Sequence, residues 1–216
     1  MQTDIQSKVA LFFQDYPVRH VPSNEIFVQA GDEPEGIFYL QQGQVRVYDI
    51  APNGSEVVVN VFKQYAFFPM SWAVTQLPNR YFYEASAPCE LRLAPAKDVL
   101  AFVQDNPEIL FDLLRRVYTG VEGMQRRMAH LMGGTARSRL VFELMIECQR
   151  FGIRQDNGSY LLTLHEDELA RRSGMSRETV NRELSKLKAE AVVGMRRHDL
   201  IVKDLHRLQQ LIGETL

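Results

Sequence analysis

A chain of 216 residues is long enough for one large domain or two modest ones, and it carries a net charge of −2 with only two cysteines. Cys89 and Cys148 lie far apart without metal-ligand spacing, which excludes a disulfide framework and a cysteine-built metal centre and favours the reducing cytoplasm. The chain shows no leader pattern and no run of about 20 apolar residues, so we expect no membrane contact.

The charges are unevenly distributed along the chain. Residues 1–108 contain 7 basic and 13 acidic side chains, a net charge of −6, whereas residues 171–197 contain 8 basic and 3 acidic side chains, a net charge of +5. A basic segment behind an acidic one predicts a modular protein whose contact with a polyanion is confined to its C-terminal part.

Residues 18–100 have the pattern of short strands separated by turns. Val45 and Val47 alternate with polar neighbours, as in a half-buried strand, and Asn53-Gly54 between two such runs is a strong hairpin signal. The candidate strands lie at 25–32, 36–50, 56–62, 80–85 and 89–94. This part of the chain predicts an antiparallel β-barrel or sandwich.

A helical period replaces the strand pattern at about Pro107. Apolar side chains then recur at alternating intervals of four and three residues, at Leu110, Leu114, Val117, Val121, Met124, Met128 and Leu131. This heptad stripe favours a partner helix and hence a two-fold homodimer; packing of the stripe onto the chain's own strands is the alternative. Gly133-Gly134 would end the helix, and residues 136–151 resume a helical period.

The segment from Glu166 to Ala189 has the organisation of a helix-turn-helix. Ala170 is small where two helices must nearly touch, Gly174 suits a left-handed turn, and Ser176 is a candidate N-cap for the second helix. One face of that helix is apolar and is expected to pack into the domain; it consists of Val180, Leu184, Leu187 and Ala191.

The opposite face carries Arg177, Glu178 and Arg182, which can reach the edges of DNA bases. Arginine pairs bidentately with guanine, and glutamate accepts a hydrogen bond from cytosine. The alternative is a solvated face on which Glu178 and Arg182 form an i,i+4 ion pair. Beyond the helix, residues 192–204 predict a hairpin with a basic tip that would hold the DNA backbone. The expected phosphate contacts are Ser176, Thr179, Asn181, Lys186, Arg196 and Arg197.

Together these motifs resemble the Crp/Fnr superfamily of bacterial regulators over nearly the whole chain. The helix SRETVNREL, the strands AGDEPEGIFYLQQGQVRVY, the helix after Asn106-Pro107-Glu108 and the closing IVKDLHRLQQLIG follow the family's order. The resemblance implies an α+β fold with a β-roll of the cyclic-nucleotide-binding type at 1–106, a dimerisation helix at 107–133 and a winged helix-turn-helix at 134–216.

The resemblance also implies partners and a mode of binding. Arg177, Glu178 and Arg182 match the triplet that reads bases in the cyclic-AMP receptor branch of the family. A homodimer on palindromic double-stranded DNA with TGTGA-like half-sites is therefore implied, with RNA polymerase as a further partner.

The effector is not determined by this resemblance. Cyclic-nucleotide binders of the family place Gly-Glu and, farther along, Arg-Ser or Arg-Thr around the ligand, whereas here these stretches run 67–72 (FFPMSW) and 79–81 (NRY). Because proline lacks a donor and methionine cannot bind a ribose hydroxyl, we expect that cyclic AMP is not the effector, although Arg80 could shift by one position to serve. The candidate effector pocket comprises Met70, Ser71, Trp72, Arg80 and Tyr81.

Several interpretations of this pocket remain open. The aromatic residues Phe67, Phe68, Trp72, Tyr81, Phe82 and Tyr83 form either a packed core or an apolar ligand site. A cyclic-nucleotide-dependent regulator of the same family is one alternative, and a haem-dependent one would need an axial ligand such as His20, Met70 or Cys89. We predict no cofactor and no metal, and a cysteine cluster for an iron-sulfur centre is absent before Cys89.

Two other functional classes fit the sequence less well. The histidines at 20, 130, 165, 198 and 206 lie in different elements without metal or triad spacing, which argues against an enzyme. A ligand-binding module whose terminal helices contact protein instead of DNA is the second class. The basic wing and the polar face of the second helix argue against it.

Overall fold

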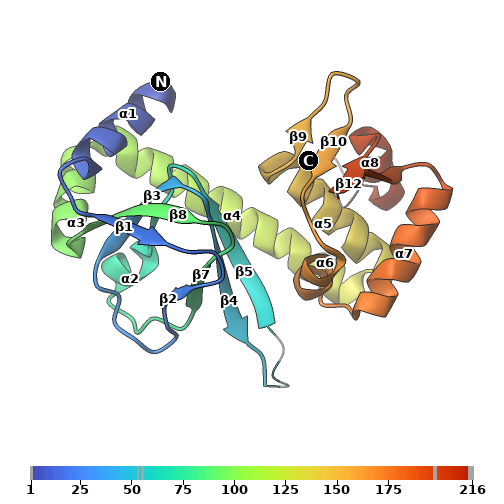
Figure 1. Cartoon of the computed structure of the whole chain (residues 1–216), viewed down its shortest axis with the longest axis horizontal. Coiled ribbons are helices and arrows are strands. Elements are labelled where there is room, and N and C mark those ends of the chain that lie inside the picture. The colour runs from blue at the N-terminus through green and yellow to red at the C-terminus, as the bar shows by residue number, and fades with distance from the viewer. Residues whose placement is uncertain (1, 53, 55, 197–198, 214–216) are drawn as a thin grey trace. The chain divides into compact units, whose positions relative to one another are not determined.

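The computed structural model describes residues 2–52, 54, 56–196 and 199–213, with side chains from Asp4 onward. The chain forms two compact units, Met1–Tyr118 and Thr119–Leu216, whose boundary lies within the long helix α4 (Pro107–Gly133). Figure 1 shows strands dominating the first unit and helices the second. The expected α+β class, with antiparallel sheets preceding a long helix and a helix-turn-helix, is confirmed. Across the described residues, each helix is too short or too polar to cross a membrane.

Two four-stranded antiparallel sheets form the N-terminal unit, in the orders β1-β8-β3-β6 and β2-β7-β4-β5. The first sheet contains β1 (Val18–Val21), β3 (Ile37–Gln42), β6 (Phe67–Phe68) and β8 (Cys89–Ala94). The second contains β2 (Ile26–Val28), β4 (Gln44–Ile50), β5 (Glu56–Lys63) and β7 (Phe82–Ala85). Their facing side chains form one buried cluster, and a second cluster joins the first sheet to α1 (Gln2–Phe13), α2 (Met70–Thr75) and α3 (Ala96–Asp105).

Gly43 divides the single strand expected at 36–50 into β3 and β4, which belong to different sheets. Its φ is +99°, and a Cβ at this position would lie 2.5 Å from the carbonyl oxygen of Pro88 and 2.6 Å from Sγ of Cys89. Only glycine fits this bend. The hairpin expected around Asn53-Gly54 is confirmed, because β4 pairs with β5 as far as Ile50 and Glu56; Asn53 itself lies outside the described residues.

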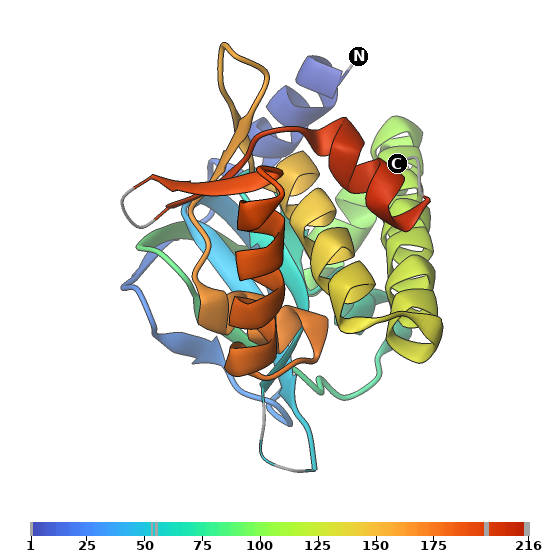
Figure 2. The ribbon, with the colours of Figure 1, turned by 90° about the vertical axis from the view of Figure 1, so that its right-hand side faces the viewer.

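The C-terminal unit packs helices around a sheet of order β11-β12-β10-β9. Figure 2 shows α5, α6 and α7 close together, in agreement with their shared buried cluster. The helices are α5 (Ala136–Arg150), α6 (Glu166–Ser173), α7 (Arg177–Ala189) and α8 (Leu205–Ile212). The strands are β9 (Ile153–Arg154), β10 (Tyr160–Leu162), β11 (Val193–Arg196) and β12 (Asp199–Val202). The break expected at Gly133-Gly134 separates α4 from α5, and Thr135 caps α5 by accepting a hydrogen bond from the Ser138 backbone.

Buried ion pairs join three helices of this unit. Glu143 of α5 is 2% exposed and accepts hydrogen bonds from Nε and Nη2 of Arg127, at the end of α4, at 2.5 and 2.9 Å. Glu147, one turn later, pairs with Arg172 of α6, whose Nε also donates to Glu168 at 2.8 Å. Burial raises the pKa of Glu143 and of Glu147. The arginines therefore compensate carboxylates that would otherwise be unfavourable in this environment.

Replacing Arg172→Met should lower the free energy of unfolding by about 3–5 kcal/mol, because Glu147 would lose its charged partner while remaining buried. Urea denaturation measures this loss. The double variant Arg172→Met/Glu147→Leu is the control and should recover most of it, since both charges are then removed. A single variant within about 1 kcal/mol of the wild type would contradict the assigned role of Arg172.

The same variant should respond to pH in a defined direction. Because the folded-state pKa of Glu147 is raised, stability is lost as the pH rises from the unfolded-state pKa through the folded-state pKa. The deficit of Arg172→Met relative to wild type should therefore shrink as the pH is lowered from 7 to about 4–5.

Candidate nucleic-acid interface

The turn between α6 and α7 has the geometry expected from the sequence. Gly174 ends α6 in the left-handed region, at φ 64° and ψ 32°. Ser176 has an extended backbone, and its Oγ accepts a hydrogen bond from the Thr179 backbone at 3.2 Å, so α7 begins with a side-chain cap. The predicted helix-turn-helix from Glu166 to Ala189 is confirmed.

One face of α7 is anchored in the core of the C-terminal unit. Val180, Leu184 and Leu187 are fully buried and pack with Leu169 and Ala170 of α6. The prediction for Ala191 was wrong. The helix ends at Ala189, Ala191 turns outward at φ 58°, and Val192 takes the buried position.

The side of α7 opposite these buried residues presents Glu178 and Arg182 to solvent, and Arg177 is exposed at the first position of the helix. The arginine side chains are 64% and 60% exposed. Within the described chain, the i,i+4 ion pair between Glu178 and Arg182 does not form; Arg182 Nε lies 3.7 Å from Oε1 of Glu183 instead. All three predicted base-contacting residues are thus accessible to solvent.

The predicted phosphate-contacting residues differ in exposure and in their hydrogen-bond partners. Ser176 and Thr179 share a hydrogen bond between their hydroxyl groups at 2.9 Å, and Lys186 Nζ binds Glu183 at 2.8 Å. Asn181 is half-buried, and its Oδ1 has no hydrogen-bond partner. Arg196 is exposed at the end of β11. Arg197 lies outside the described residues.

An ion pair that the sequence did not indicate joins the start of α5 to the end of α7. Arg137, in the first turn of α5, donates to both carboxylate oxygens of Glu190, the C-cap of α7, at 2.7 and 2.5 Å. The Arg137 guanidinium holds the pKa of Glu190 below its ordinary value. The partners are 53 residues apart, so no local spacing pattern could have indicated the pair.

The heptad stripe of α4 is exposed along its whole length. Its seven residues, Leu110 to Leu131, have exposed fractions between 37% and 58%. Phe111, Tyr118 and Met132 are even more exposed and follow stripe positions directly, which widens the apolar surface. These three residues are 7 and 14 residues apart, and this heptad spacing is the signal by which they could have been assigned to the stripe from the sequence.

The candidate effector residues do not share one environment. Met70 and Trp72 pack into the cluster between the first sheet and the helices, whereas Ser71 and Arg80 are exposed. Asn79 is buried and donates to the carbonyl oxygens of Gln29 and Tyr81 at 2.8 and 2.9 Å.

The aromatic residues of this region are divided between two cores. Phe68 stacks on Phe62 and Tyr83 between the sheets, with ring centroids 4.4 and 5.7 Å away. Its neighbour Phe67 packs with Phe13 in the helical cluster. Tyr81 is 37% exposed. This arrangement favours the packed-core alternative over an apolar ligand site.

Two of the residues considered as haem ligands lie on paired strands but differ in exposure, because His20 is exposed and Cys89 is buried. His20 lies on β1, and the buried Cys89 donates its thiol hydrogen towards the carbonyl oxygens of Gln44 and Ala87. Among the described residues, His, Cys, Asp and Glu side chains form no group of three or more that could hold a metal ion.

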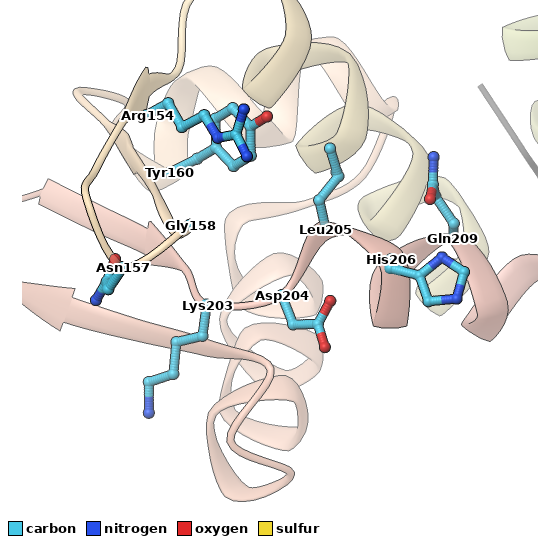
Figure 3. Close-up of a pocket in the computed structure, with 9 residues that line it drawn as sticks. All are labelled: Arg154, Asn157, Gly158, Tyr160, Lys203, Asp204, Leu205, His206 and Gln209. Carbon is cyan, nitrogen blue, oxygen red and sulfur yellow. The ribbon is translucent and has the colours of Figure 1, made fainter.

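A shallow depression of about 500 Å³ lies in the C-terminal unit at the start of α8 (Figure 3). Its lining consists of Arg154, Asn157, Gly158, Tyr160, Lys203, Asp204, Leu205, His206 and Gln209. Asp204 already caps α8 by accepting from the Arg207 backbone at 3.0 Å. The candidate effector residues are absent from this lining, which is open and largely polar, unlike a typical enclosed ligand pocket.

Comparison with known proteins assigns both units. Residues 18–106 match the cyclic nucleotide-binding domain, and residues 126–211 match the Crp-like helix-turn-helix domain. The global nitrogen regulator of Nostoc sp. is 29% identical over 83% of this chain and 82% of its own length. The cAMP-activated global transcriptional regulator CRP of Pasteurella multocida is 23% identical over 94% of this chain and 98% of its own.

A solved structure of a CRP/FNR family transcriptional regulator from Thermus thermophilus has the same fold. It superposes with a TM-score of 0.73 at 20% identity, over 92% of this chain and 99% of that one. These similar proteins are regulators and not enzymes. With both domain types matched in order, the chain belongs to the Crp/Fnr family of transcription regulators with a DNA-binding helix-turn-helix.

Proposed function

We propose that the protein is a cytoplasmic homodimer that binds a palindromic operator and regulates transcription in contact with RNA polymerase. The observation that carries this proposal is the exposed polar surface of α7, where Glu178 and Arg182 lie opposite a fully buried apolar face and Arg177 is exposed at the start of the helix. In this proposal residues 1–106 form the sensor, 107–133 the dimerisation helix and 134–216 the DNA-binding domain.

Base reading is assigned to Arg177, Glu178 and Arg182, on half-sites similar to TGTGA. A guanidinium can donate two hydrogen bonds to guanine O6 and N7, and a carboxylate can accept one from cytosine N4. Ser176, Thr179, Asn181, Lys186, Arg196 and Arg197 are assigned to the phosphate backbone. Among these, the exposed Arg196 at the end of β11 has the accessibility that a phosphate contact requires.

Dimerisation is assigned to the heptad stripe of α4. An apolar stripe that remains 37% to 58% exposed in one copy is unfavourable in water, and its 4-3 spacing is the spacing that a second α4 would complement. Gly120 and Gly123 would allow two helix backbones to approach closely, because glycine has no side chain, and the space beside both positions is open in the single chain.

The effector is proposed to be something other than cyclic AMP. Asn79 is engaged with backbone carbonyl groups, and Pro69 and Met70 occupy the stretch where cyclic-nucleotide binders of the family place Gly-Glu. The Pasteurella relative is described as cAMP-activated, so the same domain type can bind that nucleotide when the appropriate residues are present.

Arg182→Ala should cost about 1–3 kcal/mol per half-site and should relax the preference at one base pair, because a bidentate contact with guanine would be lost. Arg196→Ala should weaken all sequences alike and reduce the salt slope by about one. Titrations with matched and single-mismatch duplexes at two salt concentrations measure both effects. If Arg182→Ala kept the full base preference, Arg182 would be a phosphate contact.

Met124→Glu should weaken the dimer strongly, because it would bring like charges together at a seam from which water is excluded. Ala129→Glu adds the same charge to the same helix outside the stripe and should leave the dimer nearly intact. Sedimentation equilibrium provides the two dissociation constants. Equal dissociation constants for both variants and the wild type would show that the stripe is not the interface.

Calorimetry with millimolar cyclic AMP should give no saturable heat, since the Asn79 amide already donates to the carbonyl groups of Gln29 and Tyr81 and is not available to the nucleotide phosphate. Arg80→Ala should then behave like the wild type. Micromolar binding that Arg80→Ala abolishes would restore the nucleotide-dependent alternative.

A further inference from the structure

Asp167 and Arg177 are paired across the helix-turn-helix. Asp167 lies in the first turn of α6, and Arg177 is the first residue of α7. Oδ1 of Asp167 is 3.3 Å from Nε of Arg177, and the two side chains are 52% and 64% exposed. The pair therefore lies on the accessible side of the motif.

Folding stability does not account for this pair. An isolated ion pair with both partners half-exposed contributes little, because water screens it and two side chains must be ordered. A carboxylate in the first turn of α6 also opposes the attraction that a helix N-terminus would otherwise exert on a phosphate. Glu168 of the same turn is engaged by Arg171 and Arg172, which leaves Asp167 facing Arg177.

We propose that Asp167 is a specificity-determining residue that positions Arg177 for base reading, an inference that rests on the proposed role of Arg177 at DNA. The ion pair involves Nε, and in the described part of the chain Nη1 and Nη2 of Arg177 make no hydrogen bond. The two Nη groups remain available for guanine O6 and N7.

Two physical effects then favour the base over the backbone. A guanidinium whose conformations are biased towards a nearby carboxylate loses less side-chain entropy when it meets guanine. The negative charge of Asp167 also repels phosphates, which disfavours a competing conformation in which Arg177 swings to the backbone. Asp167 therefore lowers affinity for DNA in general while it increases discrimination at one base pair.

The experiment compares Asp167→Ala with Glu166→Ala, which removes a negative charge from the same helix turn without touching an ion pair of Arg177. The measured quantity is the ratio of dissociation constants for duplexes mismatched and matched at the base pair whose discrimination Arg177→Ala abolishes. Both variants should bind mismatched duplexes more tightly, because each removes a negative charge that repels the DNA backbone. Only Asp167→Ala should reduce the ratio, by about two- to tenfold per half-site, the ordering cost of one long side chain.

Two further variants separate positioning from charge. Asp167→Asn retains an oxygen acceptor for Nε and should keep part of the discrimination. In an Arg177→Ala background, Asp167→Ala should no longer change the ratio, as a double-mutant cycle requires. An unchanged ratio in Asp167→Ala, or an equal fall in Glu166→Ala, would overturn the positioning role.

Failure of the underlying function has a different signature. If the wild type showed no sequence-dependent binding, or if Arg177→Ala kept full discrimination at every base pair, the base-reading role of Arg177 would fail. If Arg177→Ala loses discrimination at one base pair and Asp167→Ala does not, only the inference about Asp167 fails.

Discussion

The accessible surface of α7 depends on burial of its opposite face. Val180, Leu184 and Leu187 are fully buried, and each such side chain contributes about 1.5–3 kcal/mol relative to an exposed position. Because side chains three or four residues apart share a helix face, this burial directs Glu178 and Arg182 outward, whereas Arg177 is exposed because it is the first residue of the helix. The turn at Gly174 and the cap at Ser176 then determine where that outward face begins.

Buried charge holds the frame around α7 together. Arg127 and Arg172 bind carboxylates of α5 that are almost inaccessible to water, so α4, α5 and α6 have one favourable register in the C-terminal unit. An apolar contact of similar area would tolerate sliding, whereas a buried carboxylate without its partner would be costly. The partly exposed pair between Arg137 and Glu190 adds a bidentate contact between α5 and the end of α7.

The β-sheets and the helix α4 use apolar surface in opposite ways. Between the sheets, aromatic side chains pack against one another, as in the stack of Phe62, Phe68 and Tyr83. In α4 the apolar side chains remain outside, from Leu110 to Met132. The first arrangement supports a rigid sensor fold without an evident apolar ligand site, and the second supplies a surface for a second copy of the chain.

The sequence by itself determined the features that depend on neighbours a few residues apart. The caps, the left-handed Gly174, the buried positions of α7 and the 4-3 spacing of the heptad stripe all follow from local helix geometry. Family resemblance supplied the expected order of the domains and the three base-contacting residues, whose contacts with DNA remain proposals.

The tertiary structure alone decided which distant groups meet. It divided 36–50 between two sheets because the backbone of Pro88 and the thiol of Cys89 approach Gly43, and it replaced Ala191 by Val192 in the core because α7 ends at Ala189. It also brought together Asp167 with Arg177 and Arg137 with Glu190. Long charged side chains have many possible partners, and only the packing of the elements that carry them selects one.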